Sequence, residues 1–309
     1  RRSSDLCKAP ATGIMELAAA PDGQVYGSTN FGMTIFRYNP ADGSYWNSLN
    51  VTAYGGGEVY GLVFAGERLY MTSYANGFHL EYDPEKPWNH REGVNPRILR
   101  EINPDGYIRP HTHSILGPGG MVWTGWMANY GAYGGALSRI TPATGEVALP
   151  PAGNQGIGSI AADDKAVYYV TYGAGNGLAD APGPFALCAV DPEGRETARR
   201  TLPEDLRPGR LAVCGGEVLL SAPDAIHRFE AGTLRPLGIV AVPGCTKLLP
   251  YDGGLLAFAG DGRLLRLSPG DWKVTPVCDT PRGVYAACAA GGTVWFSAAT
   301  ELWRVAGEI

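Results

Sequence analysis

An arginine and two histidines stand close together in the segment YIRPHTHS, residues 107–114, as Arg109, His111 and His113. The chain has only five histidines in 309 residues, so this grouping is distinctive. His111 and His113 are two residues apart, and side chains at that spacing share one side of an extended strand. Histidine exchanges protons near neutral pH, and arginine neutralises carboxylates. The segment therefore predicts proton-transfer chemistry on an anionic substrate, with His113 as the proton-transfer residue.

The elements that must position these residues are the strands of a repeat. Forty-four glycines and 24 prolines indicate many short strands joined by tight turns. A unit of small residue, glycine, apolar residue and aromatic residue recurs seven times, as in PDGQVYGST and AGGTVWFSA. A period of about 40 to 45 residues built of strands is typical of a β-propeller with one four-stranded blade per repeat. The central apolar positions of the seven units are Val25, Leu69, Val122, Val167, Val218, Leu255 and Val294.

We predict an all-β fold, with a single seven-bladed propeller domain over residues 1–309. The last repeat supplies about three strands, and an open ring would expose sheet edges. We therefore expect residues 1–10, around Cys7, to add the outer strand of the last blade and close the ring. The predicted blades span approximately residues 13–50, 57–102, 111–150, 156–202, 208–240, 244–279 and 283–309.

The innermost strand of each blade lines the central channel of a propeller. When the repeats are aligned on their central apolar positions, two residues of blade 2 and both histidines of blade 3 fall at the start of these inner strands. We expect the four side chains to converge at the channel mouth, near one arginine in each of two entry loops. The alternative is that the histidines only bond loop backbone. The residues of this predicted site are Glu58, Tyr60, Arg109, His111, His113 and Arg282.

The loops between the second and third strands differ among the blades. They are minimal in blades 5 to 7, but in blades 1 to 4 they carry aromatic, asparagine and glycine residues. Ring closure does not require this difference, so we predict a ligand-binding rim on one face. For each single asparagine the alternative is that an Asn-Gly pair only forms a turn. The predicted substrate-binding residues are Asn30, Asn76, Trp126, Asn129, Tyr172 and Asn176, and Tyr130 is a further catalytic candidate.

Composition narrows the classes of partner. A hydrophobic content of 45% with 18% charged residues is ordinary for a soluble globular protein. No apolar run approaches the ~20 residues of a membrane span, so we expect no membrane association. The net charge of -5 provides no broad basic surface, so nucleic acid is not an expected partner. A glycan or another small molecule is the expected substrate, and the oligomeric state stays open.

The six cysteines form no CxxC pair, and several stand in apolar segments such as FALCAV and YAACAA. We expect them to be free, buried thiols, with one or more disulfides as the alternative. Free thiols indicate a reducing compartment, so a cytoplasmic location is expected. The chain begins RRSSD without an initiator methionine or an apolar signal segment, which indicates processing. Export is therefore the alternative location.

The segments PDGQVYGSTNFGMTIFRYNPADG and YGAYGGALSRITPATGEV resemble WD40-like or Kelch-like bacterial propellers. That group includes polysaccharide lyases such as ulvan lyases and rhamnose-glucuronate lyases, and the likeness covers blades 1 to 4. It implies a channel-face site of His, Tyr and Arg that cleaves beside a uronic acid by β-elimination. The residues that could match are His111, His113, Tyr60 or Tyr130, and Arg109. The virginiamycin-type propeller lyase is similar in architecture, but its spaced histidine and glutamate metal signature is missing here.

The first functional hypothesis is therefore a lyase acting on uronic-acid glycans. Removal of the proton α to a carboxylate requires that an arginine neutralise the acid, while one side chain takes the proton and another protonates the leaving oxygen. The second hypothesis is a non-catalytic propeller that binds a glycan or protein on the same rim, since one fold hosts many functions. The third is a metal-dependent hydrolase or isomerase with a divalent ion at His111 and His113, although no cofactor is predicted.

Overall fold

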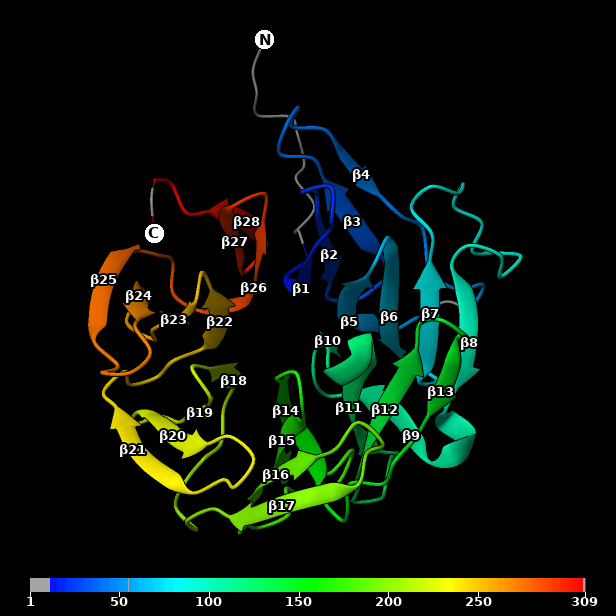
Figure 1. Ribbon diagram of the computed structural model, residues 1–309. Coiled ribbons are helices and arrows are strands. Elements are labelled where there is room, and N and C mark those ends of the chain that lie inside the picture. Colours follow the sequence, from blue (N-terminus) through cyan, green and yellow to red (C-terminus); the bar gives the residue numbers. More distant parts are fainter. Residues whose placement is uncertain (1–11, 55, 308) are drawn as a thin grey trace.

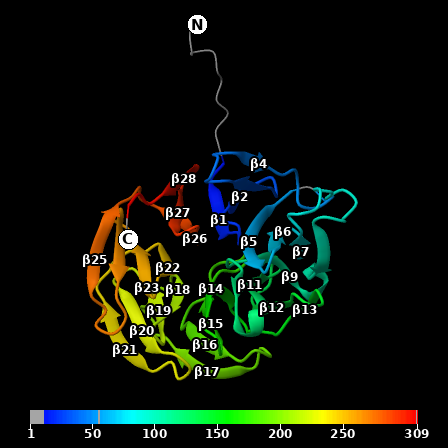
Figure 2. The ribbon, with the colours of Figure 1, turned by 45° about the horizontal axis from the view of Figure 1, so that its top comes forward.

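The computed structural model describes residues 12–54, 56–307 and 309, and it shows seven antiparallel sheets arranged in a ring (Figures 1 and 2). Helix in these residues is limited to two single turns, η2 (Asn103–Asp105) and η3 (Pro118–Gly120). Accordingly, no helix in the described part of the chain is long and apolar enough to cross a membrane. The prediction of an all-β, seven-bladed propeller is confirmed.

The first four blades follow one another around the ring, each running from an inner to an outer strand. Blade 1 contains β1 (Ile14–Ala19), β2 (Val25–Thr29), β3 (Ile35–Tyr38) and β4 (Tyr45–Asn47). Blade 2 contains β5 (Glu58–Ala65), β6 (Arg68–Tyr74), β7 (Phe78–Tyr82) and β8 (Arg97–Glu101). Blade 3 contains β9 (Tyr107–Pro110), β10 (Ile115–Leu116), β11 (Val122–Ala128), β12 (Gly135–Thr141) and β13 (Glu146–Ala148). Blade 4 contains β14 (Gly156–Ala162), β15 (Val167–Tyr172), β16 (Ala186–Val190) and β17 (Glu196–Thr201).

The last three blades complete the ring. Blade 5 contains β18 (Leu211–Cys214), β19 (Glu217–Ser221), β20 (Ile226–Glu230) and β21 (Pro236–Val240). Blade 6 contains β22 (Lys247–Tyr251), β23 (Gly254–Phe258), β24 (Arg263–Leu267) and β25 (Val274–Asp279). Blade 7 shows three strands in the described residues, β26 (Val284–Ala290), β27 (Thr293–Ala298) and β28 (Glu301–Arg304). The predicted fourth strand, residues 1–10 around Cys7, lies outside the described residues.

The hydrophobic core lies between the blades. All seven aligned apolar positions fall in the second strand of a blade and are at most 1% exposed. Seven clusters of buried side chains are present, and each joins two neighbouring blades around the ring. Each blade therefore buries its two faces against its two neighbours, and the repeat folds only as a ring.

The described residues of blade 7 and blade 1 pack directly against each other. Ile14 and Leu17 of β1 pack with Ala286 and Trp295 of blade 7 in one cluster. The backbone N–H of Ile14 also donates a hydrogen bond to the carbonyl of Ala299 at 2.9 Å. Apolar packing and this bond hold the first and last blades side by side, as both views show (Figures 1 and 2).

A β-bulge interrupts the inner strand of several blades at equivalent places. The register shifts between Ile14 and Glu16, between Val59 and Gly61, and between Ile157 and Ser159. In blade 3 the interruption is larger, because residues 111–114 separate β9 from β10, and both of these strands pair with β11. A bulge re-aims side chains relative to simple alternation. The two histidines of blade 3 lie in such an interruption.

Glycine at position 125 allows blade 3 to accommodate this interruption. A β-carbon at Gly125 would lie 2.6 Å from Cγ2 of Ile157 and 2.9 Å from Cγ2 of Thr112, closer than real β-carbons approach. The Gly125 N–H donates to Oγ1 of Thr112 at 2.8 Å, and its carbonyl accepts from the N–H of His111 at 2.9 Å. The segment with the histidines is thus bound closely to β11.

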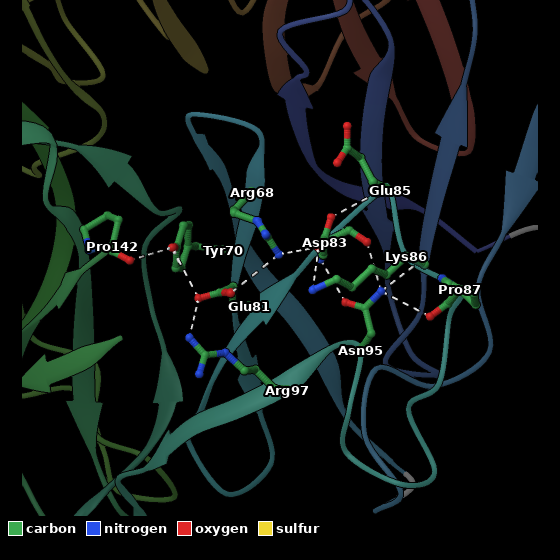
Figure 3. A network of polar contacts seen from close by, with 10 residues as sticks. All are labelled: Arg68, Tyr70, Glu81, Asp83, Glu85, Lys86, Pro87, Asn95, Arg97 and Pro142. Carbon is green, nitrogen blue, oxygen red and sulfur yellow. Dashed lines mark hydrogen bonds and ion pairs between the residues drawn. The ribbon is translucent and has the colours of Figure 1, made fainter. Parts of the chain in front are cut away.

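The insertion of blade 2, residues 83–96, lies between β7 and β8 on the outer side of the ring. Figure 3 shows the contacts that hold it: Nδ2 of Asn95 donates to the carbonyls of Asp83, Lys86 and Pro87 at 2.9, 3.1 and 3.2 Å. Arg68 of β6 pairs with Asp83, and Tyr82 packs edge-on against Trp88 at 5.0 Å. The insertion is an excursion before the outer strand and not a lid on the channel.

We expect thiol titration of the denatured, non-reduced protein to find six free groups per chain. Five of the six cysteines lie in the described residues, and all five are free. Burial raises the pKa of Cys245 and of Cys288 to about 12, so these thiols stay protonated and slow to oxidise. A count below six would show a disulfide and would favour the exported alternative.

Candidate functional site

The central channel contains two cavities joined by a narrow waist. The loop-face cavity, of about 630 Å³, lies among the blade 4 loop and the segments that enter the inner strands. The far-face cavity, of about 410 Å³, lies at the other end of the inner strands. The waist between them has a volume of about 20 Å³, enough for roughly one water molecule. The side chains that line the loop-face cavity include Tyr60, Arg109, His111, Met127, Tyr172, Asn176, Arg210 and Tyr285.

Two arginines give the loop-face cavity its electrostatic character. The Arg109 guanidinium lies over the ring of Tyr74 at 4.2 Å, and its Nη2 donates to the hydroxyl of Tyr130 at 3.3 Å. The Arg210 guanidinium lies over the ring of Tyr285 at 5.2 Å. Neither guanidinium forms an ion pair within the described part of the chain, and no Asp or Glu lines this cavity. The cavity is therefore cationic and is suited to an anion.

His111 is held in one tautomer at the wall of this cavity. Its Nδ1 lies 2.9 Å from the carbonyl of Ile157, and a carbonyl can only accept, so Nδ1 carries the proton. The ring stacks on Tyr172, with 5.2 Å between the ring centroids. Burial is the main cause that lowers the pKa of His111 below its usual range, so the imidazole is neutral near pH 7. Its Nε2 therefore has a free lone pair and can act as a base.

Tyr60 supplies a phenol where the loop-face cavity meets the waist. It lines both the loop-face cavity and the waist, and burial raises its pKa to about 12. A phenol with that pKa stays protonated near neutral pH and can donate its proton to a developing oxyanion. Asn176 lines the same cavity, but its Nδ2 already donates to the carbonyl of Ala128 at 3.3 Å.

The structure places His113 elsewhere than predicted. It lines the waist and the far-face cavity with Glu16 and Lys247, and it does not line the loop-face cavity. The interruption of the inner strand between β9 and β10 breaks the alternation that would put His111 and His113 on one side. Burial, with Lys247 and Arg210 nearby, holds the pKa of His113 well below its usual range. His113 therefore meets His111 and Tyr60 at the waist, but it does not line the cavity that Arg109 lines.

Several predicted substrate-binding residues also lie away from the cavity. Trp126 is fully buried in β11, where its Nε1 donates to Oγ of Ser138 at 2.7 Å, so its face is not available to a sugar. Asn129 bonds to the backbone and side chain of Asn103. Glu58 lies near Arg109, outside the lining of the cavity, and burial raises its pKa. The predicted residues that do not line the loop-face cavity are Glu58, Asn30, Asn76, His113, Trp126, Asn129, Tyr130 and Arg282.

Sequence reasoning missed Arg210, Tyr285 and Lys247 as site residues. Each follows or occupies the aligned start of an inner strand, in blades 5, 7 and 6 respectively. At the position after the aligned start, Arg210 and Lys247 are charged, whereas the other five blades carry small or apolar residues there, so this position is a usable signal. Of the predicted site residues, Tyr60, Arg109, His111, Tyr172 and Asn176 line the loop-face cavity. Their roles stay predictions.

No group of three or more His, Cys, Asp or Glu side chains suited to a metal ion occurs in residues 12–54, 56–307 and 309. His111 has its Nδ1 on a backbone carbonyl. Both histidines line the waist, but they do not belong to a group of three such ligands in the described residues.

The other three histidines have structural surroundings. His79 of β7 is fully buried against Trp126, with 5.0 Å between the ring centroids. Nδ1 of His90 accepts from Nε1 of Trp88 at 3.1 Å within the blade 2 insertion. His227 of β20 lies 3.3 Å from Asp224 on blade 5. None of the three lines the loop-face cavity.

Replacement of His79 by phenylalanine should remove a pH-dependent loss of stability. Burial lowers the pKa of His79 to about 3, whereas an unfolded histidine has a pKa of about 6.5. Between these values only the unfolded state binds the proton, so the free energy of unfolding falls as pH falls, by up to about 1.4 kcal/mol per pH unit. Urea unfolding of both proteins at about pH 7 and about pH 4 tests this. If the free energy of unfolding depends equally on pH in the two proteins, His79 does not cause the loss of stability at low pH.

Comparison with known proteins identifies the fold. No protein-family model matches the chain, and no curated protein matches it. A chain of the mitotic checkpoint complex matches with a TM-score of 0.69 at 14% identity, over 96% of this chain and 90% of that chain. Virginiamycin B lyase from Staphylococcus aureus matches with a TM-score of 0.65 at 16% identity, over 92% and 91% of the two chains. BamB from Moraxella catarrhalis matches with a TM-score of 0.59 at 12% identity, over 96% and 84%.

These identities show the shared fold alone. The propeller part of the predicted resemblance is confirmed, because the matches extend over nearly the whole chain. The comparisons give the polysaccharide-lyase part of that resemblance no support. Since proteins with such different names share the scaffold, any function must be argued from the residues of the channel.

Proposed function

We propose that the loop-face cavity binds a carboxylate-bearing sugar, such as a unit of a uronic-acid glycan, and cleaves it by β-elimination. The observation that carries this proposal is the presence of two arginines without ion pairs on one cavity that has no carboxylate in its lining. A histidine with a free Nε2 and a protonated tyrosine line the same cavity. The comparisons show the fold alone, so the proposal rests on these side chains.

Binding follows from the charge and shape of the cavity. A guanidinium that lacks a carboxylate partner gains most when an anion enters, because part of its hydration is already lost. Arg109 and Arg210 could each take carboxylate oxygens. A sugar ring could pack on the face of Tyr285, which lines the same cavity and is 49% exposed. A cavity of about 630 Å³ has room for one or two sugar units.

The chemistry follows from the protonation states. Nε2 of His111 takes the proton on the carbon α to the carboxylate, and the electron pair of that C–H bond forms the new C=C bond. The bond from the β-carbon to the glycosidic oxygen breaks, and the Tyr60 hydroxyl gives its proton to that oxygen. The arginines stabilise the charge that develops on the carboxylate in the transition state. Proton exchange with water restores both side chains.

A screen of uronic-acid glycans for the ultraviolet absorbance of an unsaturated uronate tests the proposal. We expect absorbance to rise with at least one glycan whose carboxylate stands next to a substituted carbon. Calorimetry on the same glycans measures binding separately from cleavage. Binding without cleavage would contradict the elimination and would favour the non-catalytic glycan-binding propeller. Absence of both would overturn the proposal as a whole.

A further inference from the structure

The far-face cavity contains chemistry that the proposed function does not use. Its wall is mainly apolar, with residues such as Leu62, Ile160, Leu211 and Leu248 from the inner strands of four blades. Glu16, His113, Lys247 and Cys288 also line it, and all but Cys288 line the waist as well. An apolar cavity with a few convergent polar groups is the usual form of a small-molecule site.

Lys247 is the unusual residue of this cavity. It is only 8% exposed, whereas Lys86, Lys165 and Lys273 are exposed, so it is the one buried lysine in the described part of the chain. Its ammonium group forms no hydrogen bond or ion pair there, although burying a lysine without a partner costs free energy. The groups that face it are Glu16, His113, Arg210 and Cys288. The observation from which we start is therefore a buried amine without a partner in the described residues, on the wall of a cavity.

Burial favours the neutral forms of both Lys247 and Glu16. It lowers the pKa of Lys247 and raises the pKa of Glu16, and the attraction between the two groups only partly opposes this. Arg210 further disfavours the ammonium form. One oxygen of Glu16 accepts the N–H of Leu17 at 3.0 Å, so the carboxyl group is held in place. Burial therefore disfavours the ammonium form of Lys247, and Glu16 lies in the same cavity as a carboxyl group that can exchange a proton with it.

We propose that the far-face cavity binds small aldehydes or ketones by forming an imine with Lys247, with Glu16 as the proton donor. The nitrogen lone pair of Lys247 attacks the carbonyl carbon, and one of the two amine protons moves to the carbonyl oxygen to give a carbinolamine. Glu16 protonates the hydroxyl group, which leaves as water while the C=N bond forms. The nitrogen loses its remaining proton, which returns to Glu16. The products are one imine and one water, and no oxidant or reductant takes part.

The cavity can admit such a ligand from solvent. Its rim includes Leu116, which is 45% exposed, and Pro250 and Ala289, which are also exposed. A volume of about 410 Å³ is enough for a compound as large as an aromatic aldehyde. The apolar wall favours an aliphatic or aromatic group on the carbonyl over a charged one.

Reductive labelling of the intact chain tests the proposal. The folded protein is treated with benzaldehyde and sodium cyanoborohydride at about pH 7, and peptide mass mapping measures the benzyl group on each lysine over time. Because the cavity holds the aldehyde beside the amine, we expect Lys247 to be labelled at least about tenfold faster than Lys86, Lys165 or Lys273, and this advantage to vanish in denaturant. Equal or slower labelling of Lys247 would overturn the proposal, and this result needs no variant.

Three variants locate the chemistry. Lys247→Met should abolish the fast label and leave the exposed lysines unchanged. Glu16→Gln keeps an acceptor for the N–H of Leu17 but cannot donate the proton, so labelling of Lys247 should slow by about 10²-fold. Ala289→Trp should narrow the rim and slow labelling of Lys247 several-fold. Unchanged labelling in Glu16→Gln would contradict its role, and unchanged labelling in Ala289→Trp would contradict entry from the far face.

Discussion

Replacement of Arg109 by methionine should weaken binding of a uronate oligosaccharide by about 10²-fold. Methionine keeps much of the side-chain volume over Tyr74 but removes the guanidinium that faces the cavity. Loss of one partner from a desolvated charge pair costs about 2–5 kcal/mol, which corresponds to this decrease or more. Calorimetric titration at fixed ionic strength with the oligosaccharide that binds best in the screen measures the effect. The unfolding temperature should change little, because Arg109 forms no ion pair in the described residues.

Two further variants serve as comparisons for Arg109→Met. Arg109→Lys keeps the charge but loses the planar stacking and the paired donors, so we expect an intermediate loss of about tenfold. Arg282→Met is the matched control, because Arg282 is exposed and does not line the cavity. It should bind the oligosaccharide as the unchanged protein does. Equal losses in Arg109→Met and Arg282→Met would mean that only the overall charge matters, and the loop-face cavity would not be the binding site.

The fold could be predicted because an apolar residue recurs at the same position in every repeat. Val25, Val218 and Val294 each follow a glycine turn and are fully buried in the second strand of their blades. A pattern that buries both faces of every blade leaves few alternatives to a closed ring. Tyr172 and Asn176, chosen because they lie on the face with the long loops, line the loop-face cavity, since that choice depended only on blade order.

The remaining details depend on local backbone geometry that alternation does not capture. The prediction for His113 assumed a regular strand, whereas β9 and β10 are separate. Both histidines line the waist, but only His111 also lines the loop-face cavity and only His113 also lines the far-face cavity. Trp126 was assigned to a loop, but β11 extends to Ala128 because β9 pairs along it. Such bulges arise from pairing between distant residues, so one short segment does not reveal them.

The missed arginine has a different cause. Arg210 lies just before β18, in a blade whose loops are short. A prediction based on long loops therefore does not include it. In a ring, however, the channel is shared by all blades, and a long side chain from blade 5 reaches the same cavity as Arg109 from blade 3. Channel-lining residues of a propeller are therefore better predicted by comparing the residues at the inner-strand starts of every blade.

Replacement of His111 by asparagine should lower the rate of β-elimination by about 10²-fold or more. The Nδ2 of asparagine can take over the bond that Nδ1 of His111 donates to the carbonyl of Ile157, but no basic nitrogen remains to accept the substrate proton. Absorbance of the unsaturated product measures the rate, and calorimetry should show nearly unchanged binding. Because burial lowers the pKa of His111, the unchanged enzyme should keep its activity somewhat below about pH 6.5, where an ordinary histidine becomes protonated.

The comparison with His113→Ala decides between the two histidines. His113 does not line the loop-face cavity, so its loss should leave the elimination rate nearly unchanged. Tyr60→Phe should resemble His111→Asn, since it removes the proton donor from the same cavity wall. If His113→Ala instead loses the activity and His111→Asn retains it, the reaction takes place at the waist. The carboxylate would then lie between Arg210 and Lys247, both of which line the waist, and Arg109 would only bind the distal part of the glycan.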